Sequence, residues 1–330
     1  MNKYSVHNYL QQRLMKQCQE LPHAFDSVND FECYKKKLRE RLCEILPVLP
    51  SAYEGTGTVI GRNQLSEDLT LESIELTLDE NLLVPVHLYK KEGTMNAPAV
   101  IICPGYGTPM NTDYYVSFAM SLANEGIAAA VIEYGGTGET AERPDYNTAI
   151  DNISSACHLL GMNEAGIRVS SNIALFNYLK RRKDINEQRI GITGLCQGSI
   201  ITAYTIAVEN GFYACAPLCG ATTYEAEVVS YASRQGGWSG ISPFVFDILK
   251  YADFQHLFSC FAPKPMLIQN NMTDIHWPLS GFEKVKQMVE EVYHLYKEKD
   301  KIQFRLSHAP HAYQGAHADN IIRFFVKQFL

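Results

Sequence analysis

Residues 194–199, GLCQGS, place a cysteine between two glycines at the junction of two apolar stretches. The preceding run, RIGITG, is predicted to be a buried strand, and the following run, SIITAYTIAV, is predicted to be a helix. Cys196 on such a sharp turn can act as a nucleophile, because the amide dipoles at the helix start favour a thiolate. Gly194 and Gly198 are then required because the neighbouring chain passes close to the turn. The alternative is a structural cysteine that is buried at the start of a helix.

A thiol nucleophile needs a base, and the base needs an anion to orient it. The apolar run PMLIQN leads into a loop with Asp274, and the next run, KIQFRL, leads to His308 and His311. Parallel strands gather an active site at their carboxyl ends, so Asp274 and His311 are predicted to complete a triad with Cys196. His311 is preferred because it lies just before the last helix, and His308 is the alternative. Asp274 could instead be a loop cap.

Acyl chemistry also requires hydrogen-bond donors for a developing oxyanion. The backbone amide of Gln197, at the start of the predicted helix, is one candidate. The second donor is expected from the glycine-rich turn CPGYGTP, which follows an earlier apolar run. The amide of Tyr106 is the preferred donor in this turn, and that of Gly107 is the alternative.

Three histidines near the end of the chain raise a competing hypothesis of a metal site. They are His308, His311 and His317. Pro310 keeps the first two from sharing a regular helical face, and this region has no thiolate partner for them. The sequence therefore predicts no metal and no cofactor.

Composition limits the class of protein. The chain has 330 residues, of which 46% are hydrophobic, enough to bury one large core or two modest ones. The net charge of −7 gives no reason to expect a nucleic-acid or anionic-membrane surface. The N-terminus does not read as a secretory signal, and no apolar run approaches the roughly 20 residues of a membrane span. Composition does not decide whether the protein forms a homo-oligomer.

The number and spacing of the cysteines indicate the redox environment of the protein. The chain has nine, an odd number without a regular spacing, which favours free thiols in a reducing cytoplasm. Cys103, Cys215 and Cys219 lie in apolar surroundings and are predicted to pack as small hydrophobic residues.

The period of the apolar residues changes along the chain. Residues 6–46 show helical spacing, and from Leu71 the runs LESIELTL and LLVPVHLY alternate like an antiparallel strand pair. Fully apolar runs then alternate with helical stretches, which predicts an α/β fold with a mostly parallel sheet covered on both faces. We therefore expect an N-terminal helical extension, residues 1–66, and an α/β domain, residues 67–330.

Residues 220–260 interrupt this alternation and are predicted to form a lid insertion. Trp238 and Phe244 in this segment, and Trp277 in the loop of Asp274, are predicted to bind an apolar substrate, although some aromatic residues of the lid will only pack it onto the body. Arg168 or Arg234 could hold an acidic substrate.

The order of CPGYG, EYGGTGET, GLCQGS, NNMTDIHWP and PHAYQG resembles the α/β-hydrolase superfamily over about residues 68–330. Residues 160–195 are similar to the branch that contains acetyl xylan esterase-like and dienelactone hydrolase-like proteins, and residues 30–50 resemble its N-terminal extension. Most of this branch uses serine, whereas dienelactone hydrolases use cysteine. Pro104 and Gly105 stand where the oxyanion loop often begins with His-Gly. The resemblance implies an α/β-hydrolase fold and activity on ester bonds.

We predict a cysteine-dependent hydrolase of an ester, lactone or thioester that works through a covalent acyl-enzyme. Its substrate would be a small acyl compound or a carrier-bound thioester. An acyltransferase or cyclase with the same triad is the alternative, since exclusion of water depends on the closed lid, and polyhydroxyalkanoate synthases also carry a cysteine at this turn. A non-catalytic binding protein is disfavoured because all three side chains occur in order.

Overall fold

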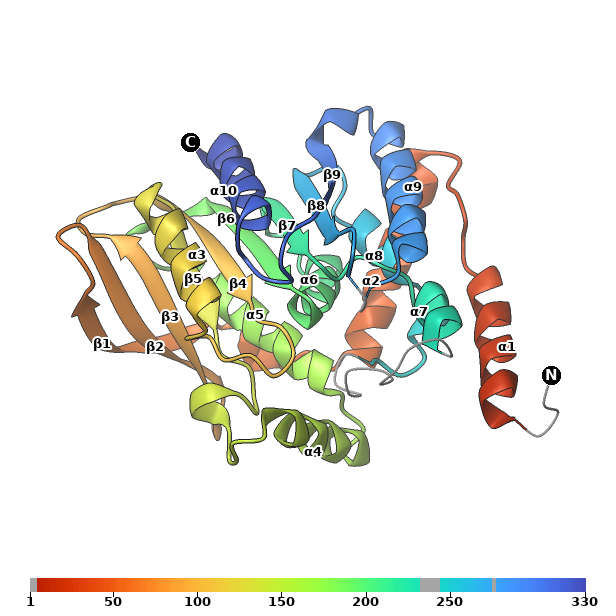
Figure 1. Ribbon diagram of the computed structural model, residues 1–330, viewed down its shortest axis with the longest axis horizontal. Coiled ribbons are helices and arrows are strands. Elements are labelled where there is room, and N and C mark those ends of the chain that lie inside the picture. The colour runs from red at the N-terminus through yellow and green to blue at the C-terminus, as the bar shows by residue number, and fades with distance from the viewer. Residues whose placement is uncertain (1–4, 232–243, 275–276) are drawn as a thin grey trace.

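The computed structural model describes residues 5–231, 244–274 and 277–330. In these residues nine strands form one sheet, in the order β1-β2-β3-β5-β4-β6-β7-β8-β9 (Figure 1). The strands are β1 (Thr56–Gln64), β2 (Leu69–Asp79), β3 (Leu82–Lys91), β4 (Ala97–Cys103), β5 (Ala128–Ile132), β6 (Ile185–Leu195), β7 (Ala214–Leu218), β8 (Met266–Asn271) and β9 (Ile302–Ser307). The helices are α1 (Val6–Gln19), α2 (Val28–Ile45), α3 (Asp113–Asn124), α4 (Tyr146–Leu159), α5 (Glu164–Lys180), α6 (Gln197–Val208), α7 (Tyr224–Tyr231), α8 (Phe254–Ser259), α9 (Leu279–Leu295) and α10 (Ala316–Phe329).

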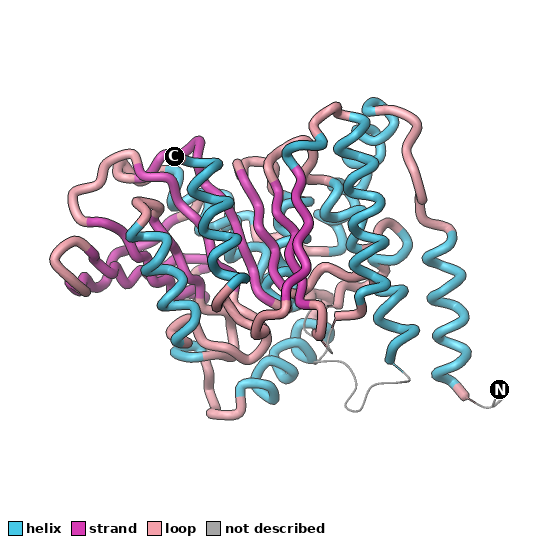
Figure 2. The backbone as a smooth tube through the Cα atoms, turned by 45° about the horizontal axis from the view of Figure 1, so that its top comes forward, coloured by secondary structure: helices cyan, strands magenta, loops and turns pink. Residues whose placement is uncertain are grey.

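The sheet has an antiparallel edge and a parallel centre. Strand β2 pairs antiparallel with both β1 and β3, and β3 also pairs antiparallel with β5. All pairs from β5 to β9 are parallel, and Figure 2 shows the later strands side by side between helices. The predicted α/β fold with a mostly parallel sheet is therefore confirmed.

Two elements differ from the expectation. Residues 56–64, which we expected within the helical extension, form strand β1. Its side chains are all partly or fully exposed and it contains two glycines, so it carries no buried apolar pattern and is held by its pairing with β2. Residues 146–159, for which the apolar pattern predicted no element, form helix α4, of which only four residues are buried.

Helices cover both faces of the sheet because the central strands are apolar on both sides. All seven residues of β4 are buried, and alternate residues join two different core clusters: Ile101 with α5 and α6 on one face, Ile102 with α3 and α10 on the other. This two-sided burial is what a parallel sheet requires. It fixes the carboxyl ends of β6, β7, β8 and β9 at a common edge.

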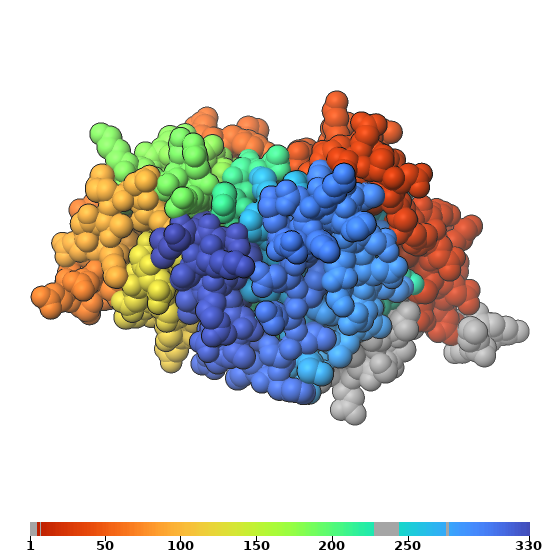
Figure 3. All heavy atoms as spheres, turned by 90° about the horizontal axis from the view of Figure 1, so that it is seen from above, coloured from red at the N-terminus to blue at the C-terminus, as the bar shows by residue number. Residues whose placement is uncertain are grey.

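The N-terminal helices pack at the end of the molecule away from β1 (Figure 3). Tyr34 of α2 donates its hydroxyl proton to the carbonyl of Tyr251 at 2.7 Å, and the side chain of Lys35 donates to the carbonyl of Ala262 at 3.2 Å. The first helices are thus joined to the segment between β7 and β8. The described part of the predicted lid, residues 220–260, contains helices α7 and α8.

Candidate active site

Cys196 occupies the turn between β6 and α6, which we call the elbow (residues 194–198). Its backbone has φ 59° and ψ −119°, a conformation that is unfavourable for a residue with a side chain and that recurs at functional sites. Its amide donates to the carbonyl of Leu218 on the neighbouring strand at 2.9 Å. The elbow is therefore held by the sheet in a strained conformation, with the Cys196 side chain part-exposed.

Glycines make this turn possible. A Cβ on Gly194 would overlap the carbonyl oxygen of Gly198, and a Cβ on Gly198 would overlap the carbonyl oxygen of Cys103 on β4. The two glycines thus lie at the close approaches that the sequence predicted. Gly220, which sequence reasoning missed, has the same role on the other side: a Cβ there would lie 2.6 Å from the carbonyl oxygen of Cys196.

Asp274 and His311 are brought together from the loops after β8 and β9. The distance between Oδ2 of Asp274 and Nδ1 of His311 is 2.6 Å. The Asp274 side chain is 2% exposed and that of His311 is 30% exposed, so the carboxylate lies behind the ring. Cys196 is within hydrogen-bonding reach of the same ring. His308, the alternative histidine, is exposed.

The imidazole of His311 lies among acidic partners. Burial lowers its pKa, but hydrogen bonds with Asp274, Cys196 and Cys219, to which the charged ring donates, outweigh burial and raise the pKa far above the ordinary value of histidine. The ring therefore holds a proton readily when an anion lies beside it. This suits a group that takes the proton of a thiol and later returns it.

Cys219, directly after β7, is a second thiol at the same histidine. It is buried, has φ 49°, and lies within hydrogen-bonding reach of His311. Sequence reasoning assigned it to packing. It does pack in the core beside α3 and α10, but its contact with His311 depends on tertiary structure and left no local signal in the sequence.

The loop after β4 lies against the elbow. A Cβ on Gly105 would be 3.3 Å from the Cβ of Cys196, so this backbone passes directly beside the sulfur-bearing side chain. The amide of Gly105 donates to the hydroxyl of Tyr115 at 2.7 Å. Among the described residues, no hydrogen-bond acceptor is recorded for the amide of Tyr106. The same holds for the amide of Gly107. Tyr106, with Gly107 as its alternative, and Gln197, the first residue of α6, stay the predicted oxyanion donors.

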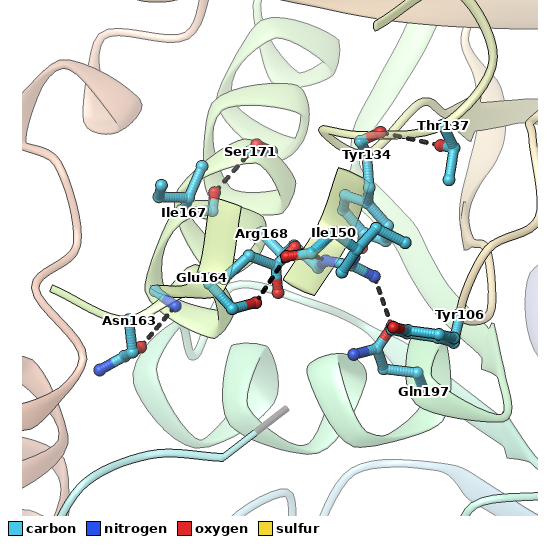
Figure 4. Close-up of polar contacts among 12 residues, drawn as sticks. Tyr106, Tyr134, Thr137, Ile150, Asn163, Glu164, Ile167, Arg168, Ser171 and Gln197 are labelled. Atoms are coloured by element: carbon cyan, nitrogen blue, oxygen red, sulfur yellow. Dashed lines mark hydrogen bonds and ion pairs between the residues drawn. The ribbon is translucent and has the colours of Figure 1, made fainter. Parts of the chain in front are cut away.

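Arg168 of α5 is hydrogen-bonded to Gln197 of the elbow (Figure 4). Its guanidinium donates to Oε1 of Gln197 at 2.7 Å, pairs with Glu164, and lies 4.7 Å from the centre of the Tyr134 ring. Arg168 is only 2% exposed. It is therefore a buried link between α5 and α6 rather than the exposed clamp for an acidic substrate that the sequence suggested. Arg234 lies outside the described residues.

The three residues predicted to bind substrate are placed differently. Trp277 packs against both core clusters, and Cys196 packs against one of them as well. Phe244 is partly buried, lies 6.0 Å from the ring of Tyr224, and lines a cavity of about 380 Å³ that also includes residues of α1. Trp238 lies outside the described residues.

One group of possible metal ligands occurs in the described part of the chain. It consists of Cys219, Asp274 and His311, whose ligand atoms lie within 4.8 Å of one another. His317, from the histidine cluster considered in the sequence, is buried, and its Nδ1 lies 2.9 Å from the carbonyl oxygen of Pro310. No helix in residues 5–231, 244–274 or 277–330 combines the length and apolarity that a membrane span needs.

Comparison with known proteins agrees with this fold. The model of the Dienelactone hydrolase family matches residues 84–233. Over these residues the chain is similar to dienelactone hydrolases, and its fold is that of an α/β-hydrolase. The match agrees with the activity on ester-type bonds that the resemblance in its motifs implied. Its match to a family with cysteine enzymes does not assign the nucleophile, which stays a prediction.

Several relatives extend the match beyond residues 84–233. The chain is 21% identical to the "Putative hydrolase YtaP" of Bacillus subtilis (strain 168) over 267 residues, covering 77% of this chain and 86% of that protein. It superposes with a TM-score of 0.76 on a putative acetyl xylan esterase from Bacteroides fragilis NCTC 9343, at 18% identity, covering 92% of this chain and 82% of the other. For a glucuronoyl esterase from Solibacter usitatus the TM-score is 0.61, at 13% identity, covering 88% and 92%. These structures share the fold of this dienelactone hydrolase-like protein.

Proposed function

We propose that this protein is a cysteine-dependent hydrolase of a small ester, lactone or thioester, with Cys196 as nucleophile and a covalent acyl-enzyme as intermediate. The observation that carries the proposal is the 2.6 Å contact between Asp274 and His311, with Cys196 in reach of the same imidazole. Acyl transfer to a side chain needs a nucleophile, a base and an orienting acid in series, and these contacts support those roles for Cys196, His311 and Asp274.

The first half of the reaction forms the thioester. His311 takes the Cys196 proton, and Asp274 holds the ring through Nδ1, so that Nε2 is the atom that exchanges protons. The thiolate attacks the acyl carbon, and the amides of Gln197 and Tyr106 stabilise the oxyanion. When the intermediate collapses, His311 returns the proton to the leaving oxygen or sulfur.

The second half releases the acid. His311 takes a proton from water, the hydroxide attacks the thioester carbon, and the proton returns to the Cys196 sulfur as it leaves. The raised pKa of His311 favours the charged ring beside a thiolate in both halves. Trp277 and Phe244 are proposed to contact the acyl group, as is Trp238.

Structural neighbours of this chain are described as esterases, which supports an ester substrate. A cysteine nucleophile favours activated acyl groups over amides. The test is a panel of aryl esters, lactones and acyl thioesters, with release of free acid and intact mass both measured. We expect acid release together with an acyl group added to the peptide that contains Cys196. Cys196→Ala should remove both signals, and Cys215→Ala, in the core of the adjacent strand, is the matched control.

Turnover without any Cys196 adduct, unchanged in Cys196→Ala, would contradict the proposal. Transfer of the acyl group to an added alcohol or amine in preference to water would instead identify an acyltransferase with the same nucleophile.

A further inference from the structure

Cys196 and Cys219 follow two neighbouring strands at the same level. Strands β6 and β7 are parallel, and Leu195 on β6 is the register partner of Leu218 on β7. The amide of Cys196 also donates to the carbonyl of Leu218, the residue just before Cys219, at 2.9 Å. Since neighbouring strands lie about 5 Å apart, the Cα atoms of the two cysteines are separated by about the same distance. A disulfide spans Cα atoms that are about 4.4–6.8 Å apart.

The two side chains also point in a common direction. Both thiols are within hydrogen-bonding reach of the imidazole of His311, which places both sulfur atoms beside one ring. Cys215, the buried cysteine within β7, belongs to the core on the opposite face of the sheet. The ends of β6 and β7 thus carry two cysteines that share one histidine.

The two thiols differ in access. Cys196 is part-exposed, whereas Cys219 is 0% exposed. An oxidant from solvent therefore meets Cys196 first, and a buried thiol lies behind it. Reactive cysteines of this kind, paired with a second thiol in reach, are the pattern of reversible thiol oxidation.

We propose that Cys196 and Cys219 form a reversible modification site, in which a hydroperoxide oxidises Cys196 and Cys219 closes a disulfide with it. The inference rests on Cys196 being the reactive thiol, as in the proposed function. Its consequence is that oxidation blocks ester hydrolysis without destroying the nucleophile.

The chemistry balances in two steps. The Cys196 thiolate attacks one oxygen of hydrogen peroxide; the O–O bond breaks, an S–O bond forms, and the other oxygen leaves as water after protonation. The Cys219 thiol then gives its proton to His311 and attacks the sulfenic sulfur, so that an S–S bond forms and the S–O bond breaks. The departing hydroxide takes the proton from His311 as a second water. Two thiols have lost two electrons to the peroxide, and an added dithiol reverses the change.

Hydrogen peroxide is the probe, and mass is the readout. The full chain carries Cys33→Ser and Cys43→Ser to remove the two exposed cysteines of α2. After limited oxidation we expect the loss of two hydrogen atoms from the intact mass and a disulfide between the peptides of Cys196 and Cys219. Ester turnover should fall in step and return with dithiothreitol. Gain of oxygen at Cys196 without a linked peptide would overturn the proposal.

Cys219→Ser in the same background removes the second thiol. We expect its Cys196 to gain two or three oxygen atoms, and its lost turnover not to return with dithiothreitol. Cys215→Ala is the matched control, because it removes another buried thiol from β7, and it should form the disulfide as the parent does. Thermal melts check that both variants are folded. A Cys219→Ser protein that recovers as fully as the parent would also overturn the proposal.

The two proposals fail separately. If the disulfide forms but turnover survives Cys196→Ala, the nucleophile assignment fails and the modification site stands. If turnover depends on Cys196 but no linked peptide appears, the modification site fails and the hydrolase proposal stands.

Discussion

Strands β6 and β7 end side by side, and each is followed by a cysteine with positive φ that is in reach of His311. After β6 the chain enters helix α6 at once, and Cys196 is part-exposed. After β7 there is no such helix start, and Cys219 is buried, which raises its pKa although the hydrogen bond from His311 opposes this. The two sites therefore share a cysteine and the contact with His311. They differ in the exposure of the thiol and in the helix that begins directly after Cys196.

The largest difference between the two cysteines is expected when each is replaced by alanine and ester turnover is measured. We expect Cys196→Ala to lose ester turnover on the order of 10⁴-fold or more, because removal of a nucleophile leaves only the oxyanion donors and binding. Cys219→Ala should lose far less, since in the proposed reaction it forms no bond to the acyl group. Initial rates on the best substrate of the panel measure both. Equal losses in the two variants would mean that Cys196 has no special role.

The next effect concerns the sulfur of Cys196 itself. Cys196→Ser should fold normally and still lose turnover on the order of 10²-fold, because the shorter side chain places the oxygen further from the acyl carbon. A serine hydroxyl also depends wholly on His311 for its proton transfer. Rates of the serine and alanine variants, with thermal melts, test this. A serine variant as active as the parent would indicate a site that does not distinguish oxygen from sulfur.

Alkylation should separate the two thiols without mutation. At neutral pH we expect iodoacetamide to modify Cys196 at least about tenfold faster than Cys219, since the thiolate at a helix start is the reactive form and burial protects the other. Peptide mapping over time gives both rates. The exposed Cys33 provides the reference for an ordinary thiol. Faster labelling of Cys33 than of Cys196 would contradict the proposed reactivity.

A smaller effect is expected on stability. The pKa of His311 is raised in the folded state, so the contact with Asp274 stabilises the fold fully below the unfolded value of about 6.5 and less as pH rises toward the folded value. Asp274→Asn should therefore unfold more easily than the parent near pH 6, and the difference should shrink toward pH 9. Denaturant midpoints at both pH values measure it. A difference that grows with pH would mean that the ring is neutral in the folded protein.

The sequence predicted the elements that carry a buried apolar pattern. Strand β6, whose last six residues are buried, and helix α6 are of this kind, and they fix the position of Cys196. Strand β1 was missed because all its side chains are at least partly exposed, and only its pairing with β2 makes it a strand. Helix α4 was missed for a similar reason, since few of its side chains are buried.

The site residues were predictable where neighbouring residues in the sequence indicate their role. Gly194 and Gly198 flank a cysteine at a strand end, and the loops of Asp274 and His311 follow apolar strands. Cys219 carries no such mark, because its meeting with His311 depends on three strands lying in register. The link from Arg168 to Gln197 likewise joins residues 29 positions apart through tertiary packing.

The hydrogen bonds that hold the N-terminal segment have a consequence for the order of folding during synthesis. Pro22 accepts from the ring of His256 at 2.8 Å, across 234 positions, and Tyr34 donates to the carbonyl of Tyr251 across 217. At about 5–20 residues per second, a ribosome needs roughly 10 to 50 seconds to add the partner of Pro22. Helix α2 therefore leaves the ribosome long before its partners and waits with Phe31, Leu38 and Leu42 uncovered. Its docking is a late event, and in that interval these three side chains are open to a chaperone.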